Sequence, residues 1–397
     1  MSLNFPLLQL KEMMVPIERP EAPLPGEIYR QLGVKLWGEG AYERESIEGS
    51  QTKYKTLSRV EENDIVVNKI WARNGTVAVV PESLSGCFVS GEFPTFKPIR
   101  DKLEPRWFHW LTKTKGFWSQ CDEKSQGTSG KNRIRPERFL DIEIPLPLPD
   151  EQRRIVARIE ELAARIEEAR ELRRRAVDEA DALMDKYAEY LFNNSNCYSQ
   201  SIESICEVKG GIQKSSERTP GANPRRYITV AHVQRNWIDT SDARYFEVSD
   251  EELEKWRLLP GDVLVIEGNG SADQIGRTAL FSGEIEDCVH QNHVIRIRPN
   301  QKWILPDYLN GFLNSPPGQK QMRERSRTTS GLFNLSVGRI KSIDVPLPLL
   351  KDQQRIVEKL QEMRYKFDAL QRLQAESAAE LDALIPSILD KVFNGEL

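Results

Sequence analysis

Cations, hydroxyls and amides gather in several short segments of this 397-residue sequence. The densest segment runs from Arg323 to Ser330, where three arginines are interspersed with and followed by hydroxyl side chains. Guanidinium and hydroxyl groups are good donors to phosphate oxygens. The run therefore predicts contact with a polyanion, and its candidate DNA-binding residues are Arg323, Arg325, Arg327 and Thr328.

Other segments combine cations with amide or imidazole side chains, which can read the edges of DNA bases. The alternative for each of these residues is an ordinary solvated surface position. The further candidates for DNA contact are Lys53, Lys55, Arg59, Arg73, Asn74, Lys113, Lys115, Lys131, Arg133 and Arg135 in the first half of the chain, and Arg225, Arg226, His232, Arg235, Asn236, Gln291 and Asn292 in the second half.

The usual catalytic and metal-binding sets are missing from the sequence. Cys288, His290 and His293 have the residue types of a zinc site, but they fall on a predicted strand, and the matching segment after Cys87 has no histidine. The sequence contains no phosphate loop, dinucleotide-binding glycine motif, convincing nuclease site or amino-methyltransferase motif. We therefore expect neither a catalytic site nor a metal site on this chain.

The chain is an internal repeat. The sequence Ile-Pro-Leu-Pro-Leu-Pro-Asp-Glu-Gln-Arg-Arg-Ile-Val at 144–156 recurs as Val-Pro-Leu-Pro-Leu-Leu-Lys-Asp-Gln-Gln-Arg-Ile-Val at 345–357, 201 positions later. At the same offset, Thr-Ser-Gly at 128–130 recurs at 329–331. Two divergent copies of one unit therefore make up the chain.

Each Pro-Leu-Pro segment precedes a long charged stretch, Asp150 to Phe192 and Lys351 to Phe393, with apolar residues at steps of four and three. This spacing predicts two amphipathic helices of roughly 60 Å. We expect the helices to pack on each other as a coiled coil, although each could instead fold back onto its own domain. Pro386 is expected to kink or break the second helix. The predicted coiled-coil core residues are Ile155, Ile159, Leu162, Ile166, Leu183, Ile356, Leu360, Met363, Phe367, Leu370, Leu381 and Leu384.

The rest of the chain is typical of mixed α/β domains. Short β-rich runs such as Asp262-Val-Leu-Val-Ile alternate with turns of Gly, Pro and Asn. Short helices are predicted at Pro105 to Lys115 and Pro306 to Leu313. The fold class is therefore α+β. The predicted boundaries are 1–143 and 195–344 for the two mixed α/β domains, and 144–194 and 345–397 for the two helical regions.

The composition is that of a water-soluble intracellular protein, with a net charge of -4 and 39% hydrophobic residues. No apolar run approaches the roughly 20 residues that a membrane-spanning helix needs, so we expect a cytoplasmic protein with no membrane partner. The five cysteines include no C-x-x-C pair and are expected to be reduced. The segments Asp150 to Phe192 and Lys351 to Leu397 together carry a charge of -5, which leaves about +1 for the rest of the chain and supports polyanion binding only weakly.

These features together resemble the specificity subunit of type I restriction-modification systems. The resemblance rests on two divergent halves, each followed by Pro-Leu-Pro, then Glu151-Gln152 or Asp352-Gln353, then Arg-Ile-Val and a long helix. It covers essentially the whole chain, including the C-terminal end from Ile388 to Leu397. The first half departs from the pattern because it begins with the Pro-rich segment 16–25, which leaves the fold of its first forty residues open.

The resemblance implies that the two mixed α/β domains are target recognition domains, each reading one half of a split double-stranded DNA sequence. It implies an antiparallel coiled coil with pseudo-two-fold symmetry that holds the domains apart and sets an unread spacer. It further implies a non-catalytic chain without a cofactor, which recruits two methyltransferase subunits and also restriction subunits. In this family the partner subunits hold S-adenosylmethionine, ATP and magnesium. The candidate methyltransferase-docking residues are Gln152, Arg154, Gln353 and Arg355.

Two other classes of function compete with this interpretation. An enzyme with its own catalytic site is disfavoured by the missing motifs. A two-headed protein scaffold without DNA specificity would show no salt-dependent binding to duplex DNA. A DNA-reading subunit instead predicts binding that weakens steeply as salt is added.

Overall fold

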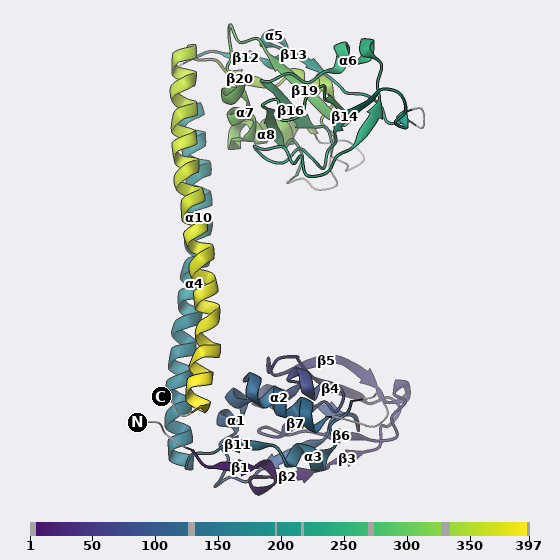
Figure 1. Cartoon of the computed structure of the whole chain (residues 1–397), viewed down its shortest axis with the longest axis vertical. Helices are drawn as coiled ribbons and strands as arrows, with labels where there is room; N and C mark the ends of the chain where they lie inside the picture. Colours follow the sequence, from purple (N-terminus) through teal and green to yellow (C-terminus); the bar gives the residue numbers. More distant parts are fainter. Residues whose placement is uncertain are drawn as a thin grey trace. The chain divides into compact units, whose positions relative to one another are not determined.

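The computed structural model describes residues 5–125, 132–194, 197–215, 218–268, 274–326 and 334–394. The chain divides into two compact units, of which unit 1 comprises Met1–Arg173 and Gln374–Leu397 and unit 2 comprises Arg174–Leu373. Helix α4 (Pro149–Asn193) and helix α10 (Leu350–Phe393) both cross this division (Figure 1). Each unit therefore contains one mixed α/β domain and a part of both long helices.

The domain of unit 1 is built on three sheets. Its strands are β1 (Leu7–Gln9), β2 (Met14–Ile17), β3 (Pro20–Glu21), β4 (Ile28–Val34), β5 (Ala41–Glu48), β6 (Leu57–Arg59), β7 (Ile65–Val67), β8 (Val77–Val79), β9 (Phe88–Val89), β10 (Thr95–Pro98) and β11 (Glu143–Pro145). The strand orders are β1-β11, β2-β10-β7-β8 and β3-β6-β9-β4-β5. Strands β7 and β8 are buried at every residue, as their continuous apolar sequences predict.

Short helices cover the sheets of unit 1. They are α1 (Pro105–Leu111), α2 (Lys115–Lys124) and α3 (Pro136–Leu140). Pro105 occupies the first turn of α1, where its missing N–H costs no hydrogen bond. Trp107 and Phe108 of this helix are fully buried in the core of unit 1, which also includes Ile159 of α4 and Leu389 of α10. The long helices are thus part of the core of the domain.

The domain of unit 2 also has three sheets. Its strands are β12 (Ser199–Ser201), β13 (Cys206–Lys209), β14 (Pro224–Ile228), β15 (Tyr245–Glu247), β16 (Asp262–Ile266), β17 (Thr278–Phe281), β18 (Val289–His290), β19 (Val294–Pro299) and β20 (Asp344–Pro346). Its helices are α5 (Ile202–Ile205), α6 (Asp250–Trp256), α7 (Pro306–Asn314), α8 (Pro316–Ser326) and α9 (Val337–Lys341). The strand orders are β12-β20, β13-β19-β16-β17 and β15-β14-β18.

The two domains repeat one topology. The pair β12-β20 corresponds to β1-β11, and the sheet β13-β19-β16-β17 corresponds to β2-β10-β7-β8. The third sheet of each domain contains one parallel pair, β4 with β9 and β14 with β18. The Pro-rich opening of the first half, whose fold the sequence left open, therefore contains a strand, β2, in the place of β13. The predicted α+β class and the two-fold repeat are confirmed.

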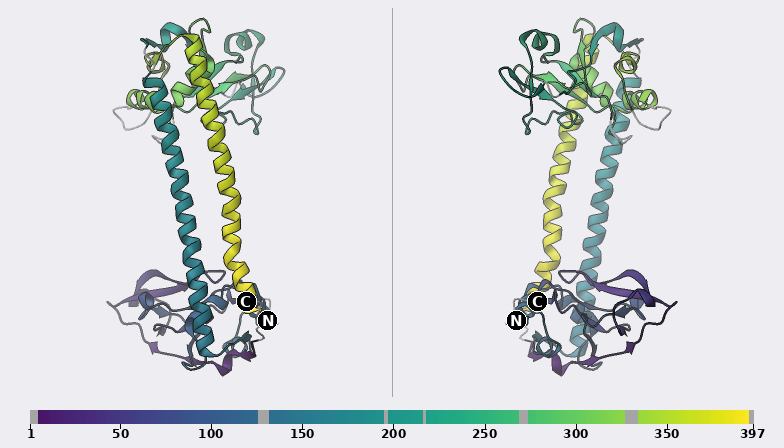
Figure 2. Two further views of the ribbon diagram at one scale, coloured as in Figure 1. Left: turned by 90° about the vertical axis from the view of Figure 1, so that its left-hand side faces the viewer. Right: turned by 90° about the vertical axis from the view of Figure 1, so that its right-hand side faces the viewer.

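The long helices run antiparallel within each unit, and Figures 1 and 2 show them side by side. In unit 1, Arg170 of α4 donates to Asp382 of α10 at 2.6 Å, while Ile159 shares a core with Leu389. In unit 2, Phe192 of α4 shares a core with Ile356 of α10. The predicted packing of the two helices on each other is confirmed, and near each domain the same stripe also packs on that domain.

Two of the predicted coiled-coil core residues are wrong. Leu183 and Leu384 are 58% and 42% exposed, whereas the other ten are buried or half-buried. A straight helix has 3.6 residues per turn, so the apolar stripe moves by one position over a long run. Ile385 accordingly packs against the core of unit 1 in place of Leu384. Pro386 does not break α10, which continues to Phe393.

Candidate nucleic-acid interface

A groove of about 800 Å³ lies inside unit 2, where the mixed α/β domain meets the long helices. The domain lines this groove with the loop Arg235–Trp237 and with residues of α7 and α8, and the helices line it with residues such as Asp185 of α4 and Phe367 of α10. Trp237 is an exposed large aromatic residue. The groove therefore combines cations, amides and an aromatic surface, which are the groups that bind DNA backbone and bases.

Two of the predicted DNA-binding cations, Arg235 and Arg323, line this groove. The pKa of Arg235 is lowered, chiefly by burial and then by the nearby charge of Arg323. Two cations brought together in this way would be stabilised by an anion between them. The same groove also contains charges of both signs on the long helices, with Asp181 and Asp185 of α4 and Arg364 of α10.

Amide side chains form a connected network beside these cations. Asn236 accepts hydrogen bonds at Oδ1 from Nδ2 of Asn314 at 2.8 Å and from Nδ2 of Asn310 at 3.3 Å. Asn310 in turn accepts from the Thr278 hydroxyl at 3.0 Å. This network fixes the exposed Asn236 side chain on the domain.

The run at Arg323 to Thr328 divides into three parts. Arg323 is exposed and lines the groove. Arg325 turns back onto its own domain, where it donates to the carbonyl of Ser342 at 3.0 Å and lies 3.6 Å from Asp344. Arg327 and Thr328, like Lys131 in unit 1, lie outside the described residues. Of the described members of the run, Arg323 is the one that lines the groove.

Several other candidates in unit 2 are held by intramolecular contacts. His232 is buried and accepts the Thr229 N–H at Nδ1, and burial is the main cause of its lowered pKa, so it is not available for base contact. Arg225 pairs with Asp250 and Asp287 at 3.3 and 3.4 Å. These side chains stabilise the domain. The half-buried candidates are Arg226, which donates to the Thr240 carbonyl, and Gln291 and Asn292, whose main-chain N–H groups donate to the carbonyls of Ile228 and Ile212.

Candidates in unit 1 divide in a similar way. Arg59 pairs with Glu21 at 2.7 Å and Arg133 pairs with Glu92 at 3.2 Å, so their charges are partly neutralised within the domain. Lys113 has a lowered pKa, mainly because of burial. Lys115 and Arg135 are exposed.

A pocket of about 280 Å³ lies on the largest sheet of unit 1 and is lined by Tyr54, Trp71 and Asn68 among others. Lys53 and Lys55 are exposed on either side of Tyr54. Arg73 and Asn74 lie just after Trp71 and are half-buried. Four predicted residues thus lie next to the segments that line this pocket.

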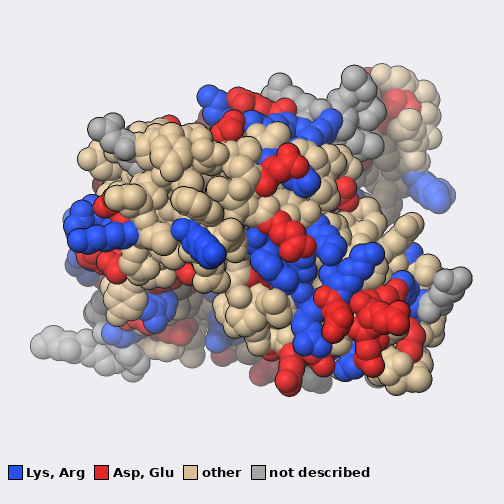
Figure 3. All heavy atoms as spheres, turned by 90° about the horizontal axis from the view of Figure 1, so that it is seen from above, with Lys and Arg blue, Asp and Glu red and all other residues tan. Residues whose placement is uncertain are grey.

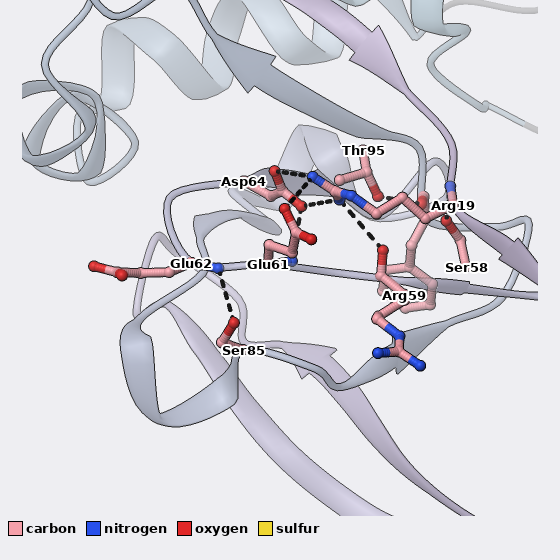
Figure 4. Close-up of polar contacts among 9 residues, drawn as sticks. Arg19, Ser58, Arg59, Glu61, Glu62, Asp64, Ser85 and Thr95 are labelled. Carbon is pink, nitrogen blue, oxygen red and sulfur yellow. Dashed lines mark hydrogen bonds and ion pairs between the residues drawn. The ribbon is translucent and has the colours of Figure 1, made fainter.

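Figure 4 shows a buried carboxylate near Arg59, that of Asp64, to which the Arg59 side chain makes no contact. Asp64 is almost fully buried and accepts hydrogen bonds from Arg19 at 2.5 Å and from the Glu61 N–H at 2.8 Å. The Arg59 main-chain carbonyl accepts from Arg19, and its side chain points away. Unit 2 has a similar pair, Arg298 with Asp262 at 2.6 Å. Both buried carboxylates precede or begin a buried strand and stabilise it.

The predicted docking residues Gln152 and Gln353 need correction. Both side chains are fully buried, so they cannot contact a partner. Gln152 accepts the Glu104 N–H and donates to the carbonyls of Lys102 and Pro147. Gln353 makes the three equivalent bonds in unit 2, with Leu305, Trp303 and Pro348. They lock each long helix to its domain.

Two exposed leucines in the same segments were not singled out. Leu148 and Leu349 are 79% and 77% exposed, and they occupy equivalent positions in the two Pro-Leu-Pro repeats. Arg154 and Arg355 are also exposed, and Arg154 pairs with Glu151. The repeat could have pointed to these two leucines. Both copies have leucine at this position, although an exposed position next to a helix start does not require an apolar residue.

On the face drawn in Figure 3, Lys and Arg side chains lie among Asp and Glu side chains, and neither sign of charge dominates a broad area. Among the described residues, no three His, Cys, Asp or Glu side chains gather as a metal site requires. Cys288 and His290 are buried, and His293 lies 2.9 Å from Glu267. None of the helices in the described part of the chain is long and apolar enough to cross a membrane.

Comparison with known proteins identifies relatives of one kind. The chain is 28% identical over 304 residues to the type I restriction enzyme EcoKI specificity subunit of Escherichia coli, which covers 72% of this chain and 64% of that protein. It is 26% identical over 314 residues to the StySPI specificity subunit of Salmonella potsdam, covering 74% of this chain and 66% of that protein. The chain thus aligns with slightly less than two thirds of the length of each of these curated relatives.

The fold is shared with a solved structure. The crystal structure of the HsdS subunit from Thermoanaerobacter tengcongensis superimposes with a TM-score of 0.61 over 99% of this chain and 97% of that one, at 23% identity. The family described as the type I restriction modification DNA specificity domain matches residues 14–173 and 195–377. These two matches take in most of both domains and of both long helices, and the chain therefore belongs to the type I restriction-modification DNA specificity family.

Proposed function

We propose that this chain reads a split sequence in double-stranded DNA, with one half-site for each unit, and assembles partner enzymes on that sequence. The observation that carries the proposal is that the two units share the buried hydrogen bonds that hold each domain to its helix but differ in the side chains at the groove. Gln152 and Gln353 make the same three hydrogen bonds in the two units. By contrast, three residues that line the groove of unit 2, Asn310, Asn314 and Arg323, stand where unit 1 has His109, Lys113 and Asp122. Two domains of one fold with different surfaces are suited to read two different sequences.

The proposed domain assignment follows the repeat. Target recognition domains correspond to 1–143 and 195–344, and the helical regions 144–194 and 345–397 serve as a spacer. Helices α4 and α10 have 45 and 44 residues, and both are continuous. Paired helices of this length resist bending, so they suit a fixed distance between two reading surfaces. A fixed distance would specify a fixed number of unread base pairs, as half-site spacing does in other dimeric DNA-binding proteins.

The proposed partners are double-stranded DNA, two methyltransferase subunits and restriction subunits. In this proposal the chain itself is non-catalytic and holds no cofactor, and the methyltransferase and restriction subunits supply S-adenosylmethionine, ATP and magnesium. Leu148 and Leu349 support a docking surface at the start of each long helix, because an exposed leucine gains free energy when a partner covers it. The two equivalent positions suit two copies of one subunit. A cytoplasmic location follows from access to host DNA.

Binding to duplex DNA tests this proposal against the protein-scaffold alternative. A labelled duplex carrying the recognised sequence, together with the assembled methyltransferase complex, should show affinity that falls steeply between about 50 and 200 mM salt. A scrambled duplex should bind more weakly at every salt concentration. Equal affinity for the two duplexes, or no binding to either by a stable complex, would favour the scaffold.

A further inference from the structure

The backbone turns into a left-handed conformation in one matching loop of the two units, and in neither unit is the residue there glycine. Trp37 of unit 1 has a φ of 58° and Asn236 of unit 2 has a φ of 70°. The Trp37 N–H donates to the Asn74 carbonyl at 2.7 Å, just before β8, and the Asn236 N–H donates to the Thr278 carbonyl at 2.8 Å, at the start of β17. The two acceptors are three residues apart in the repeat, but the loops correspond, because Trp37 follows β4 and Asn236 follows β14, and each of these strands makes the parallel pair of its sheet.

Each loop also rests on the end of the equivalent helix. A Cβ on Gly38, next to Trp37, would lie 2.4 Å from the carbonyl oxygen of Thr112, at the end of α1. Asn236 accepts from Asn314, the last residue of α7. The conformation is therefore held by the domain on two sides in both units.

The other left-handed residues behave differently. Asn63 precedes β7 where Gly261 precedes β16, and Asp287 precedes β18 where Gly86 precedes β9. Each is thus a tight turn that the other unit makes with glycine. Asn and Asp tolerate this conformation, but it is a genuine outlier for a bulky residue such as tryptophan. A side chain kept at Trp37 and Asn236, where glycine would be free of strain, indicates a function for that side chain.

Both side chains are presented to the outside. Trp37 remains 48% exposed although its ring contacts Trp118, with the centroids 5.3 Å apart. Asn236 is exposed, and it lines the unit 2 groove between Arg235 and Trp237. The Nδ2 group of an amide can donate to a base edge, and an indole ring can contact a base through its apolar face.

We infer that Trp37 and Asn236 are specificity-determining residues, each contacting bases of the half-site read by its own unit. This inference rests on the proposed DNA-reading function. Asn236 would donate from its Nδ2 to an acceptor on a base edge, because its Oδ1 already accepts from Asn310 and Asn314, and Trp37 would make an apolar or stacking contact. The arginines beside Asn236 would hold the backbone of the same strand.

Glycine substitutions test the inference because glycine keeps the backbone conformation and removes the side chain. The assembled methyltransferase complex would be given a DNA library randomised around the recognised sequence, and the methylated products would be sequenced. Asn236→Gly should reduce discrimination by about tenfold or more at one or two positions of one half-site, the usual effect of losing a base contact. Trp37→Gly should do the same in the other half-site only.

Asn63→Gly is the matched control, because it makes the same change at an exposed left-handed residue of a simple turn. It should leave every base preference unchanged. If Trp37→Gly fails to fold, Trp37→Asn, which introduces the residue type of unit 2, provides the same comparison. Unchanged preferences in folded Asn236 and Trp37 variants, with a wild-type complex that reads a split sequence, would overturn this inference alone. A wild-type complex that reads no sequence would overturn the proposed function as well.

Discussion

Trp118 of unit 1 and Gln319 of unit 2 make the same hydrogen bond with different chemistry. The indole N–H of Trp118 donates to the Thr112 carbonyl at 2.6 Å, and the amide of Gln319 donates to the Leu313 carbonyl at 2.8 Å. Donors and acceptors are each 201 positions apart, so the bond is equivalent in the two units. The domains have kept the anchors of their scaffold while changing side-chain volume, aromaticity and polarity around them. One scaffold therefore carries side chains of different chemistry in the two units.

Replacing Gln152 or Gln353 by leucine should destabilise the unit that contains it. Each substitution removes three hydrogen bonds and leaves a main-chain N–H and two carbonyls buried without partners, which should lower the free energy of unfolding by about 2 to 4 kcal/mol. Urea unfolding followed by circular dichroism measures the change. Gln354→Leu, at an exposed position, is the control and should cost less than about 0.5 kcal/mol. A loss below about 1 kcal/mol for both buried glutamines would contradict their locking role.

Stability should fall in mild acid because of buried histidines. Burial is the main cause that lowers the pKa of His290 to about 4, below the usual value of about 6.5. The folded state therefore keeps His290 neutral, and its contribution to stability is complete above about pH 6.5. As the pH falls from 6.5 towards 4, His290 binds a proton in the unfolded chain but not in the folded chain. This difference lowers the free energy of unfolding by about 1.4 kcal/mol per pH unit.

Thermal unfolding of the wild type and of His290→Gln between pH 7 and 5 checks this dependence. The variant should be less stable at pH 7 and should lose less stability than the wild type as the pH is lowered. His293→Gln, at an exposed position, should follow the wild type. Parallel curves for the wild type and His290→Gln would show that His290 does not cause the acid sensitivity.

Arg323 and Arg325 should differ in their contribution to DNA binding. Arg323 faces the groove of unit 2, whereas Arg325 is held by Ser342 and Asp344. Arg323→Ala should weaken binding to all sequences about equally and reduce the slope of log affinity against log salt by about one, as expected for one phosphate contact. Fluorescence anisotropy at several salt concentrations gives both quantities, and Arg325→Ala should leave the slope unchanged. A loss of base discrimination without a change in slope would mean that Arg323 reads a base instead.

Leu148 and Leu349 should be needed for methyltransferase assembly. Changing either leucine to aspartate places a charge on the proposed docking surface and should weaken the association by about tenfold or more, measured by co-purification and by calorimetric titration. Leu259→Asp, at an exposed position in the domain of unit 2, is the control and should leave the complex intact. Wild-type assembly by the double variant Leu148→Asp, Leu349→Asp would exclude these positions from the docking surface.

The length of the helices should set the unread spacer. Removing seven residues from α4 and the matching seven from α10 keeps the apolar stripes in register and shortens both helices by about 10 Å. The complex should then recognise the same two half-sites with a spacer shorter by about three base pairs. Methylation of duplexes with graded spacers measures this. An unchanged spacer would rule out the helices as a ruler.

The sequence predicted the parts of this structure that depend on local spacing. Apolar residues recur at steps of four and three in α4 and α10, and a proline begins α1 and α7. Both signals lie within a short segment of sequence, so both predicted helices. The burial of Gln152 could not be predicted, because its partners Glu104, Lys102 and Pro147 come near it only in the folded chain. Strand β2 was not predicted because Pro16 interrupts it, and pairing with β10 decides its conformation.

The candidate site was predicted less completely than the fold. Arg323, Arg235 and Asn236 line one groove. The sequence named all three as candidates in two separate segments, and it did not predict that these segments would meet. Residue type alone could not separate Arg323 from Arg325, because two positions along a helix turn the side chain to a different face. The left-handed backbone conformation of Trp37 could not be predicted, because tryptophan rarely adopts it.

The most direct measurement of the central claim is to co-express this chain with its methyltransferase partner and map methylated adenines across the genome of the host. Two reading units joined by helices of fixed length predict one split motif with a constant number of unread base pairs between its halves. A stable complex that methylates no defined sequence, or a single continuous motif without a spacer, would contradict the account.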